Sequence, residues 1–241
     1  MEPKRIIIVG ATSGLGLNIA GRFIAEGWRV GAVGRNVEAL GRLRELAPDR
    51  VQTAVIDITA ADADEKLLAL IETMGGIDIY FHCSGILCES DPQATVATNV
   101  GGFTSMVSAA FGYFRRTRSA GRLVAISSIA GTRGLGDLPC YSATKAYDST
   151  YLEALRQLAD KEKLPLRVVD IRPGWTRTPL LDDNKHYLLE MDQQTVCRSI
   201  FRAILRARRT AIIGLRWQLL CTLQRHLPAP LWERLHLPLW H

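Results

Sequence analysis

The residue types best suited to proton chemistry lie near the middle of the chain. Tyr141 and Lys145 are four positions apart, which places a phenol and an ammonium group on one face of a helix. Lowering a phenol's pKa from about 10 by ~3 units requires about 4 kcal/mol, part of which the ammonium would supply. Ser128 would donate a hydrogen bond to a substrate oxygen as negative charge develops there. Together they predict proton transfer at a carbonyl or alcohol oxygen, although each alone also fits an ordinary structural role.

The elements that must hold these side chains alternate regularly. Short apolar runs typical of buried parallel strands are residues 5–9, 28–33, 51–56, 77–81, 123–127, 166–171 and 211–213. Segments with helical length and periodicity are residues 15–25, 38–46, 63–74, 94–114, 142–161 and 195–206. We therefore expect an α/β fold: a doubly wound parallel sheet of about seven strands in a three-layer α/β/α arrangement. A single domain would span residues 1–241, with residues 215–241 as a basic tail.

A glycine-rich turn follows the first expected strand and leads into a helix. Its sequence, Gly-Ala-Thr-Ser-Gly-Leu-Gly, occupies residues 10–16. Glycines there let the backbone approach a pyrophosphate, which free N–H groups and the positive end of the helix dipole would hold. Glycines alone often mean only a tight turn, but the strand before and the helix after favour a dinucleotide site. The expected contacts are Gly10, Thr12, Ser13, Gly14, Leu15 and Gly16.

The residues after the second and third expected strands bear on the choice of cofactor. A site for NAD usually offers an acid to the adenosine ribose at the first of these places, whereas here Gly34 is followed by Arg35 and Asn36. Arg35 would instead bind a 2′-phosphate, so NADP(H) is favoured over NAD(H), unless Arg35 is merely a solvated surface residue. Asp57 either accepts a hydrogen bond from the adenine amino group or caps the following helix through its neighbour Thr59.

These motifs, in this order, resemble the short-chain dehydrogenase/reductase family over roughly residues 5 to 180. The resemblance implies a Rossmann-type fold with Tyr141 as general acid/base, Lys145 as its activator, Ser128 as the substrate-orienting hydroxyl and Asn99 as a fourth member. Two glycines after Asn99 favour a helix kink, and a carbonyl freed there would bind a water that relays protons to the lysine. Further cofactor contacts implied by the resemblance are Ile58, Ser84, Gly85, Tyr141, Lys145, Pro173, Gly174, Thr176 and Thr178. The Pro-Gly pair also fits a plain turn.

The sequence departs from the family pattern at two places. Val9 stands where a threonine is usual, which removes a side-chain hydrogen bond from the first turn. Residues 82–85 read His-Cys-Ser-Gly where Asn-Asn-Ala-Gly is expected, and Cys83 cannot supply the hydrogen bonds of an asparagine amide. We interpret His82 as a core or strand-end residue, because a tyrosine already fills the role of the base. Cys83 and Cys140 are interpreted as packing residues.

The positive charge is concentrated at the C-terminal end. The net charge is +6, and eight arginines and one acid from Thr195 onward give that segment +7, which leaves −1 for the rest. This uneven distribution, without a nucleic-acid motif, argues against nucleic acid as a partner. Leu215, Leu219, Leu223 and Leu227 recur every four residues and predict a basic amphipathic helix. Such a helix packs on its own domain or on a dimer partner, or rests at a membrane surface.

The remaining composition favours a cytoplasmic protein. Five scattered cysteines without a CxxC pair indicate neither a disulfide framework nor a zinc site, and we expect no metal. We see no signal core or transmembrane span, although peripheral contact of residues 215–241 with a membrane stays open.

The sequence favours an NADP(H)-dependent reductase or dehydrogenase that acts on a small carbonyl compound or secondary alcohol, in a homodimer or homotetramer. Substrate-facing residues are expected in segments 132–139 and 179–194, but their mixed character leaves the substrate open. One alternative is an epimerase or dehydratase of the same fold. The other is a non-catalytic dinucleotide sensor or scaffold that docks through its basic tail.

Overall fold

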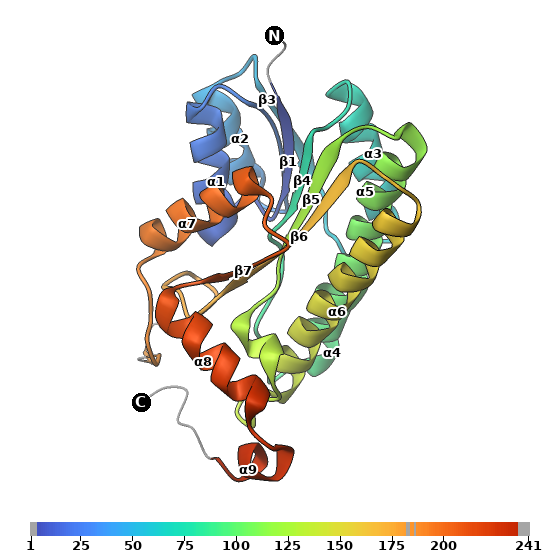
Figure 1. Cartoon of the computed structure of the whole chain (residues 1–241). Coiled ribbons are helices and arrows are strands. Elements are labelled where there is room, and N and C mark those ends of the chain that lie inside the picture. The colour runs from blue at the N-terminus through green and yellow to red at the C-terminus, as the bar shows by residue number, and fades with distance from the viewer. Residues whose placement is uncertain (1–3, 182–183, 186, 236–241) are drawn as a thin grey trace.

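A parallel sheet forms the centre of the molecule in the computed structural model, which describes residues 4–181, 184–185 and 187–235 (Figure 1). Within these residues seven strands are hydrogen-bonded in the order β3-β2-β1-β4-β5-β6-β7. Their bounds are β1 Arg5–Val9, β2 Arg29–Gly34, β3 Val51–Val55, β4 Ile79–His82, β5 Gly121–Ile126, β6 Leu166–Pro173 and β7 Thr210–Ile213. The central strands are buried on both faces, as their near-continuous apolar sequences require. The predicted doubly wound sheet is confirmed.

Helices cover both faces of the sheet and make the fold three-layered (Figure 1). One face carries α1 Gly14–Ala25, α2 Val37–Leu46 and α7 Gln193–Arg206. The other carries α3 Ala63–Thr73, α4 Pro92–Val96, α5 Phe103–Thr117 and α6 Pro139–Lys161. Each face has its own apolar core, with Phe23 and Ile200 in one and Leu67, Phe103 and Leu152 in the other.

The predicted kink near Asn99 is present as a π-helical segment, Ala97–Gly102, between α4 and α5. The π-helical segment ends at Gly102, which lies directly against Ile58 in the loop after β3. A Cβ on Gly102 would lie 2.8 Å from the carbonyl oxygen of Ile58. A helix with an ordinary side chain there could not approach the loop after β3 so closely.

The loops that follow the strands meet at the carboxyl edge of the sheet. The N–H groups of Gly10 and Ala11 donate to the carbonyl of Val33, and that of Cys83 donates to Val9. The N–H of Ser127 donates to Ile171 in the same way. These bonds continue the strand pairing past the strand ends and bring the glycine turn, the end of β4 and the Ser127 loop to one edge of the sheet.

The C-terminal segment forms α8 Leu215–His226 and α9 Ala229–Arg234 beyond β7 (Figure 1). Trp217 and Cys221 of α8 are buried, whereas Leu215, Leu219 and Leu223 face solvent. The helix therefore packs on its own domain, but through a different face from the predicted leucine row. No helix in the described ranges is long and apolar enough to cross a bilayer. Asp182, Asp183 and His186 of the expected substrate segment, and residues 236–241 of the tail, lie outside the described residues.

Candidate active site

The turn between β1 and α1 is closed so tightly that only glycine fits. Gly10 has a φ of +87°, and a Cβ there would lie 2.8 Å from the backbone nitrogen of Ser84. A Cβ on Gly16 would lie 2.0 Å from the carbonyl oxygen of Gly10. Ser13 is extended and precedes the first turn of α1, so N–H groups there face the cleft without a side-chain cap. This backbone cradle fits a pyrophosphate.

Arg35 lies at the mouth of the same cleft, where it faces a carboxylate. Its guanidinium is 3.6 Å from Asp57, and its side chain is 73% exposed. Asp57 accepts hydrogen bonds from the N–H and hydroxyl of Thr59 at 3.0 and 2.8 Å, and these bonds, with Arg35, lower the pKa of Asp57. Asp57 binds Thr59 as predicted but does not cap the following helix, because α3 begins only at Ala63. The contact with adenine stays a prediction. Asp57 also holds Arg35 beside the cleft.

Tyr141 and Lys145 are buried on the face of α6 that borders the cleft. The ammonium of Lys145 lies 5.8 Å from the centre of the Tyr141 ring. Burial raises the pKa of Tyr141, while Lys145 and a hydrogen bond with Ser128 lower it; the net direction is upward. The phenol of the protein alone is therefore protonated at neutral pH, and the predicted lowering, to which a bound cofactor would contribute, stays a prediction.

The buried Asp148 explains why Lys145 has less influence on the phenol than expected. Its Oδ2 lies 2.9 Å from Nζ of Lys145, and both side chains are almost completely buried. Burial by itself would lower the pKa of Lys145. Asp148 and Tyr141 raise this pKa by more than burial lowers it, so the pKa of Lys145 lies above its usual value. Burial raises the pKa of Asp148 to about 6. The pair is ionised at neutral pH, and sequence reasoning missed it, although an acid three positions after a lysine was a visible signal.

The two adjacent serines after β5 have different partners. The hydroxyl of Ser127 donates to Oδ1 of Asp170 at 2.5 Å, and Arg172 binds the other oxygen of that carboxylate at 2.7 Å. Ser128 instead caps a short 3-10 helix by accepting from the N–H of Ala130 at 3.1 Å. Ser127 is thus committed to Asp170, whereas the Ser128 hydroxyl lies near enough to Tyr141 to lower the pKa of its phenol.

Asn99 anchors the chain after β4 rather than lining the cleft. Its Oδ1 accepts from the N–H of Ile86, and its Nδ2 donates to the carbonyl of the same residue, both at 2.8 Å. Nδ2 also lies 3.2 Å from the hydroxyl oxygen of Thr144 on α6. Asn99 thereby ties the π-helical segment, the loop after β4 and the helix of Tyr141 together.

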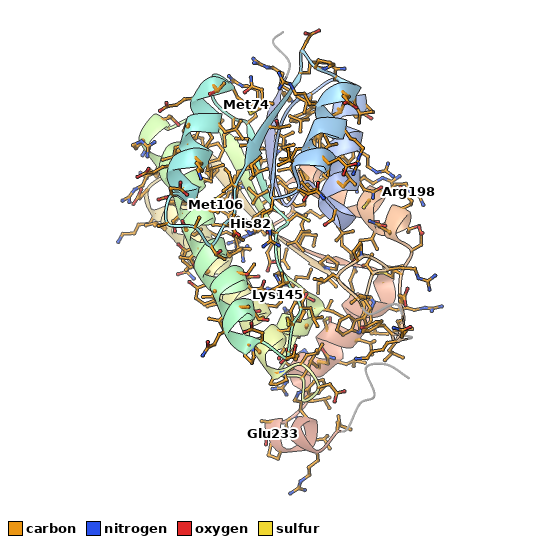
Figure 2. The ribbon with its side chains drawn as sticks, turned by 180° about the vertical axis from the view of Figure 1, so that it is seen from behind. Met74, His82, Met106, Lys145, Arg198 and Glu233 are labelled. Atoms are coloured by element: carbon orange, nitrogen blue, oxygen red, sulfur yellow. The ribbon has the colours of Figure 1, made fainter. Side chains whose placement is uncertain are left out.

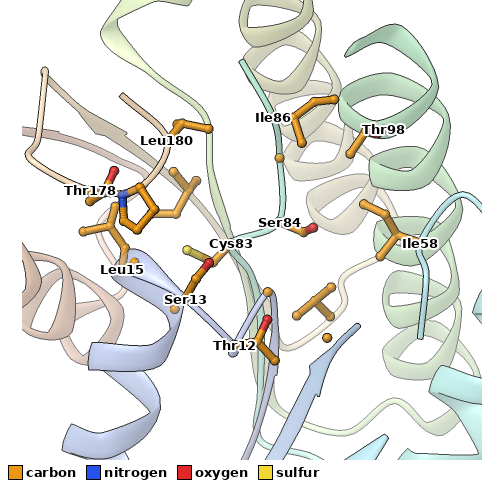
Figure 3. Close-up of a pocket in the computed structure, with 18 of the residues that line it drawn as sticks. Thr12, Ser13, Leu15, Ile58, Cys83, Ser84, Ile86, Thr98, Thr178 and Leu180 are labelled. Carbon is orange, nitrogen blue, oxygen red and sulfur yellow. The ribbon is translucent and has the colours of Figure 1, made fainter. Parts of the chain in front are cut away.

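One cleft of about 330 Å³ is lined both by the glycine turn and by Tyr141 and Lys145 of α6. Figure 3 shows the part of it around Thr12, Ser13 and Ser84. Expected site residues that line it are Gly10, Thr12, Ser13, Gly14, Leu15, Gly16, Arg35, Asp57, Ile58, Ser84, Gly85, Tyr141, Lys145 and Thr178. Pro179 and Leu180, from the segment expected to face the substrate, also line it. Lining residues that were not predicted as contacts are Val9, Gly34, Ile56, Cys83, Ile86, Thr98, Ile126 and Ser127. Most of the latter adjoin a predicted residue, so proximity in sequence was the available signal.

Five expected residues lie beside the cleft rather than in its lining: Asn99, Ser128, Pro173, Gly174 and Thr176. Gly174 is covered by α8, since a Cβ on it would lie 2.1 Å from Nε1 of Trp217. Thr176 is buried and donates to the carbonyl of Gly174 at 2.9 Å. The Pro-Gly turn is thus held between the sheet and the C-terminal helix.

A model of the short chain dehydrogenase family matches residues 4–187. The chain belongs to the short-chain dehydrogenase/reductase family. An uncharacterized oxidoreductase of Myxococcus xanthus is 32% identical to this dehydrogenase/reductase over 248 residues, which cover 97% of this chain and 96% of that protein. The NADP-dependent 3-hydroxy acid dehydrogenase YdfG of Salmonella typhi is 31% identical over 180 residues, which cover 70% of this chain and 71% of that protein.

A solved short chain dehydrogenase from Burkholderia cenocepacia, in complex with NADP, has the same fold. Its TM-score is 0.82 at 21% identity, and the match covers 98% of this chain and 99% of that one. The Rossmann-type fold that the motifs implied is confirmed, and the chain is an oxidoreductase of this family.

Two residues that depart from the family pattern, His82 and Cys83, lie next to each other at the end of β4; His82 is buried, whereas Cys83 is partly buried and lines the cleft. His82 lies in the interior (Figure 2), where its Nδ1 is 3.0 Å from the hydroxyl of Tyr80 and its ring meets Phe103 edge to face. Burial, with Lys145 nearby, lowers the pKa of His82 to about 3. Burial raises the pKa of Cys83 to about 12. The neutral imidazole of His82 is a packing group, in agreement with the sequence interpretation, whereas the protonated thiol of Cys83 forms part of the cleft lining.

The buried His82 should make the protein sensitive to acid. Its pKa is about 3 in the folded state and 6.5 in the unfolded state, so the unfolded state binds more protons between these values, and acidification destabilises the fold. Between pH 7.5 and 5 this group should cost about 2 kcal/mol of unfolding free energy. Urea unfolding of the wild type and of His82→Asn at both pH values isolates it from other titrating groups. Equal losses in both proteins would refute this account.

Proposed function

We propose that this protein is an NADP(H)-dependent oxidoreductase that transfers a hydride between the nicotinamide and a small carbonyl compound or secondary alcohol. The observation that carries the proposal is the buried set of Tyr141, Lys145 and Ser128 beside a cleft whose other end is a glycine cradle. A cleft that joins an anion cradle to a protonated phenol supplies the two functions that this chemistry needs from the protein.

The residues present fit a dinucleotide cofactor along the whole cleft. The N–H groups around Ser13 would hold the pyrophosphate, and Arg35 would face the adenosine ribose. Ser84 and Gly85 follow β4 beside the cleft, while Thr178 lies across it, next to Gly14. Remaining cofactor contacts that we propose are Ile58, Pro173, Gly174 and Thr176. The nicotinamide supplies or accepts the hydride when the cofactor is bound.

The protein's own groups manage the proton and the oxygen of the substrate. The Tyr141 hydroxyl, protonated at neutral pH, donates its proton to the carbonyl oxygen as that oxygen gains negative charge. Ser128 donates a hydrogen bond to the same oxygen. Lys145, held by Asp148, stabilises the phenolate that remains. We further propose that a water at the π-helical segment near Asn99 returns a proton through Lys145.

Apolar side chains pack with Tyr141 in one buried cluster. Ile129, Leu138, Trp175 and Tyr187 are buried in the same cluster as Tyr141. Such surroundings favour a carbonyl carried on an apolar group over a small charged substrate. The test is a screen of NADPH oxidation over apolar and polar carbonyl compounds, and the Tyr141→Phe variant is its control. A lack of turnover across the panel, with NADPH bound, would favour the sensor or scaffold alternative.

Arg35 should set the preference between the two cofactors. Its guanidinium is exposed at the cleft mouth and lies 3.6 Å from Asp57, its one acidic partner among the residues that the structure describes. A 2′-phosphate would bind this guanidinium through charge-assisted hydrogen bonds of about 1.5–3 kcal/mol, so Arg35→Ala should weaken NADPH binding about 10- to 100-fold. Binding of NADH should change little. Titrations of both cofactors against both proteins measure this, and equal losses for NADPH and NADH would contradict the assignment.

A further inference from the structure

The exposed face of α8 carries a row of leucine side chains. Leu215, Leu219 and Leu223 occupy successive turns and are 82%, 62% and 54% exposed. The opposite face is fixed, because Trp217 packs on Gly174 and the hydroxyl of Thr132 lies 3.6 Å from Sγ of Cys221. The helix is therefore held rigidly with its leucines outward, which is an arrangement typical of a contact surface.

A basic hollow lies directly beside this leucine row. It is bounded by α7, β7 and α8, has a volume of about 650 Å³, and is lined by Arg202, Arg206 and Arg208 together with Leu215 and Thr222. None of the described residues that line it is acidic. The three arginines take part in no ion pair among the residues that the structure describes. Their charge is thus available to an anion.

The N-terminus of α8 adds to the positive potential of the hollow. Gly214 and Leu215, where α8 begins, both line it, and Gly214 provides no side-chain cap for the first N–H groups. Uncapped N–H groups and the positive end of a helix dipole favour phosphate oxygens. Arginine likewise binds phosphate through paired hydrogen bonds.

We propose that α8 and the adjoining hollow dock on an anionic phospholipid surface. Headgroup phosphates bind Arg202, Arg206 and Arg208, and the leucine row enters the boundary between headgroups and acyl chains. A second copy of the chain is a poorer occupant, since a symmetric contact through this face would bring arginines against arginines. A soluble anion would use the hollow but leave the leucines exposed. This docking surface does not depend on the reaction proposed above.

The leucines are tested by sedimentation of the full chain with vesicles. The wild type should bind vesicles of about one part phosphatidylglycerol to two parts phosphatidylcholine, should not bind phosphatidylcholine alone, and should be released by high salt. The triple variant Leu215→Gln, Leu219→Gln, Leu223→Gln should lose at least about tenfold in partition. Leu46→Gln is the control, because Leu46 is 64% exposed on α2. Absence of wild-type binding, or equal binding by the triple variant, overturns the proposal.

The arginines are tested by comparing two triple variants that lose the same amount of charge. Replacement of Arg202, Arg206 and Arg208 by Gln should lower vesicle binding about tenfold or more. Replacement of the exposed arginines Arg42, Arg44 and Arg116 by Gln removes the same charge elsewhere and should have a much smaller effect. Equal losses in the two variants would mean unspecific attraction and would overturn the assignment of the hollow.

The oligomeric state tests whether a second copy of the chain, rather than a lipid surface, covers this face of α8. Light scattering should give the same mass for the wild type and for the leucine variant. A wild-type dimer that the leucine substitutions convert to a monomer would assign this face to another copy and overturn the lipid proposal. Circular dichroism of each variant verifies the fold, and the arginine variant, whose side chains are exposed, tests the proposal even if the leucine variant is unstable.

Discussion

Replacement of Tyr141 by Phe should lower the turnover number for carbonyl reduction about 10²- to 10⁴-fold, the range for loss of a general acid. The ring would still fill its buried place on α6, so the fold should be retained. NADPH affinity should change little, because the glycine cradle is formed by another part of the cleft. The loss would therefore reside in the chemical step. Steady-state rates and NADPH titrations of both proteins measure the two quantities.

The control for this variant is Tyr147→Phe on the same helix. The hydroxyl of Tyr147 lies 2.7 Å from that of Thr104, outside the cleft lining, and its loss should leave turnover nearly unchanged. Because burial raises the pKa of Tyr141, reduction by the wild type should decline only at alkaline pH, where the phenol loses its proton. Comparable turnover by Tyr141→Phe and wild type would eliminate the phenol as proton donor.

Replacement of Asp148 by Ala should lower the unfolding free energy by about 3–5 kcal/mol, because it leaves the Lys145 ammonium buried without its partner. The loss should shrink at high pH, where Lys145 becomes neutral. With Asp148 present, the pKa of Lys145 is raised, so the pair's stabilisation persists at neutral pH and is lost as pH rises through that value. Chemical denaturation of both proteins over a range of alkaline pH checks the magnitude and the direction.

Asp160→Ala provides the matched control, since Asp160 is exposed on the same helix, and its loss should cost less than about 0.5 kcal/mol of unfolding free energy.

The variant Asp148→Asn tests whether the charge of Asp148, and not only its contact with Lys145, affects Tyr141. It preserves the shape and an acceptor for Lys145 but removes the counter-charge, so the ammonium should act more strongly on Tyr141. We expect the alkaline decline of reduction to shift to lower pH in this variant. An unchanged pH profile would leave Asp148 with a structural role only.

Local sequence features were sufficient for the sheet, the cradle and the pairing of Tyr141 with Lys145. Apolar runs separated by helical periodicity predict strands and helices because burial and side-chain spacing are properties of neighbouring residues. Element ends were less certain: the helix expected from residue 142 begins at Pro139, where a proline fits the first turn. The kink after Asn99 was also predictable, since Gly101 and Gly102 mark it in the sequence.

Other features of the site required the folded chain. The partners of Ser127 and Asn99 are Asp170 and Ile86, which come from different elements, and only the packing of the strand ends brings them together. The direction of the Tyr141 pKa also depended on tertiary structure. Burial and the Lys145–Asp148 pair together decide it, and the depth of a side chain below the surface is not readable from its neighbours in sequence.

The C-terminal helix α8 depends both on the local sequence and on the tertiary structure. The sequence by itself determined that residues after Gly214 form a basic helix with leucines every fourth position, because that periodicity is local. Only the tertiary structure decided which face is buried. The indole of Trp217 fits against Gly174, where a Cβ is missing, and that contact between segments 43 positions apart turns the leucines outward. Helical periodicity fixes which side chains share a face, but complementary shape elsewhere in the fold selects the face that packs.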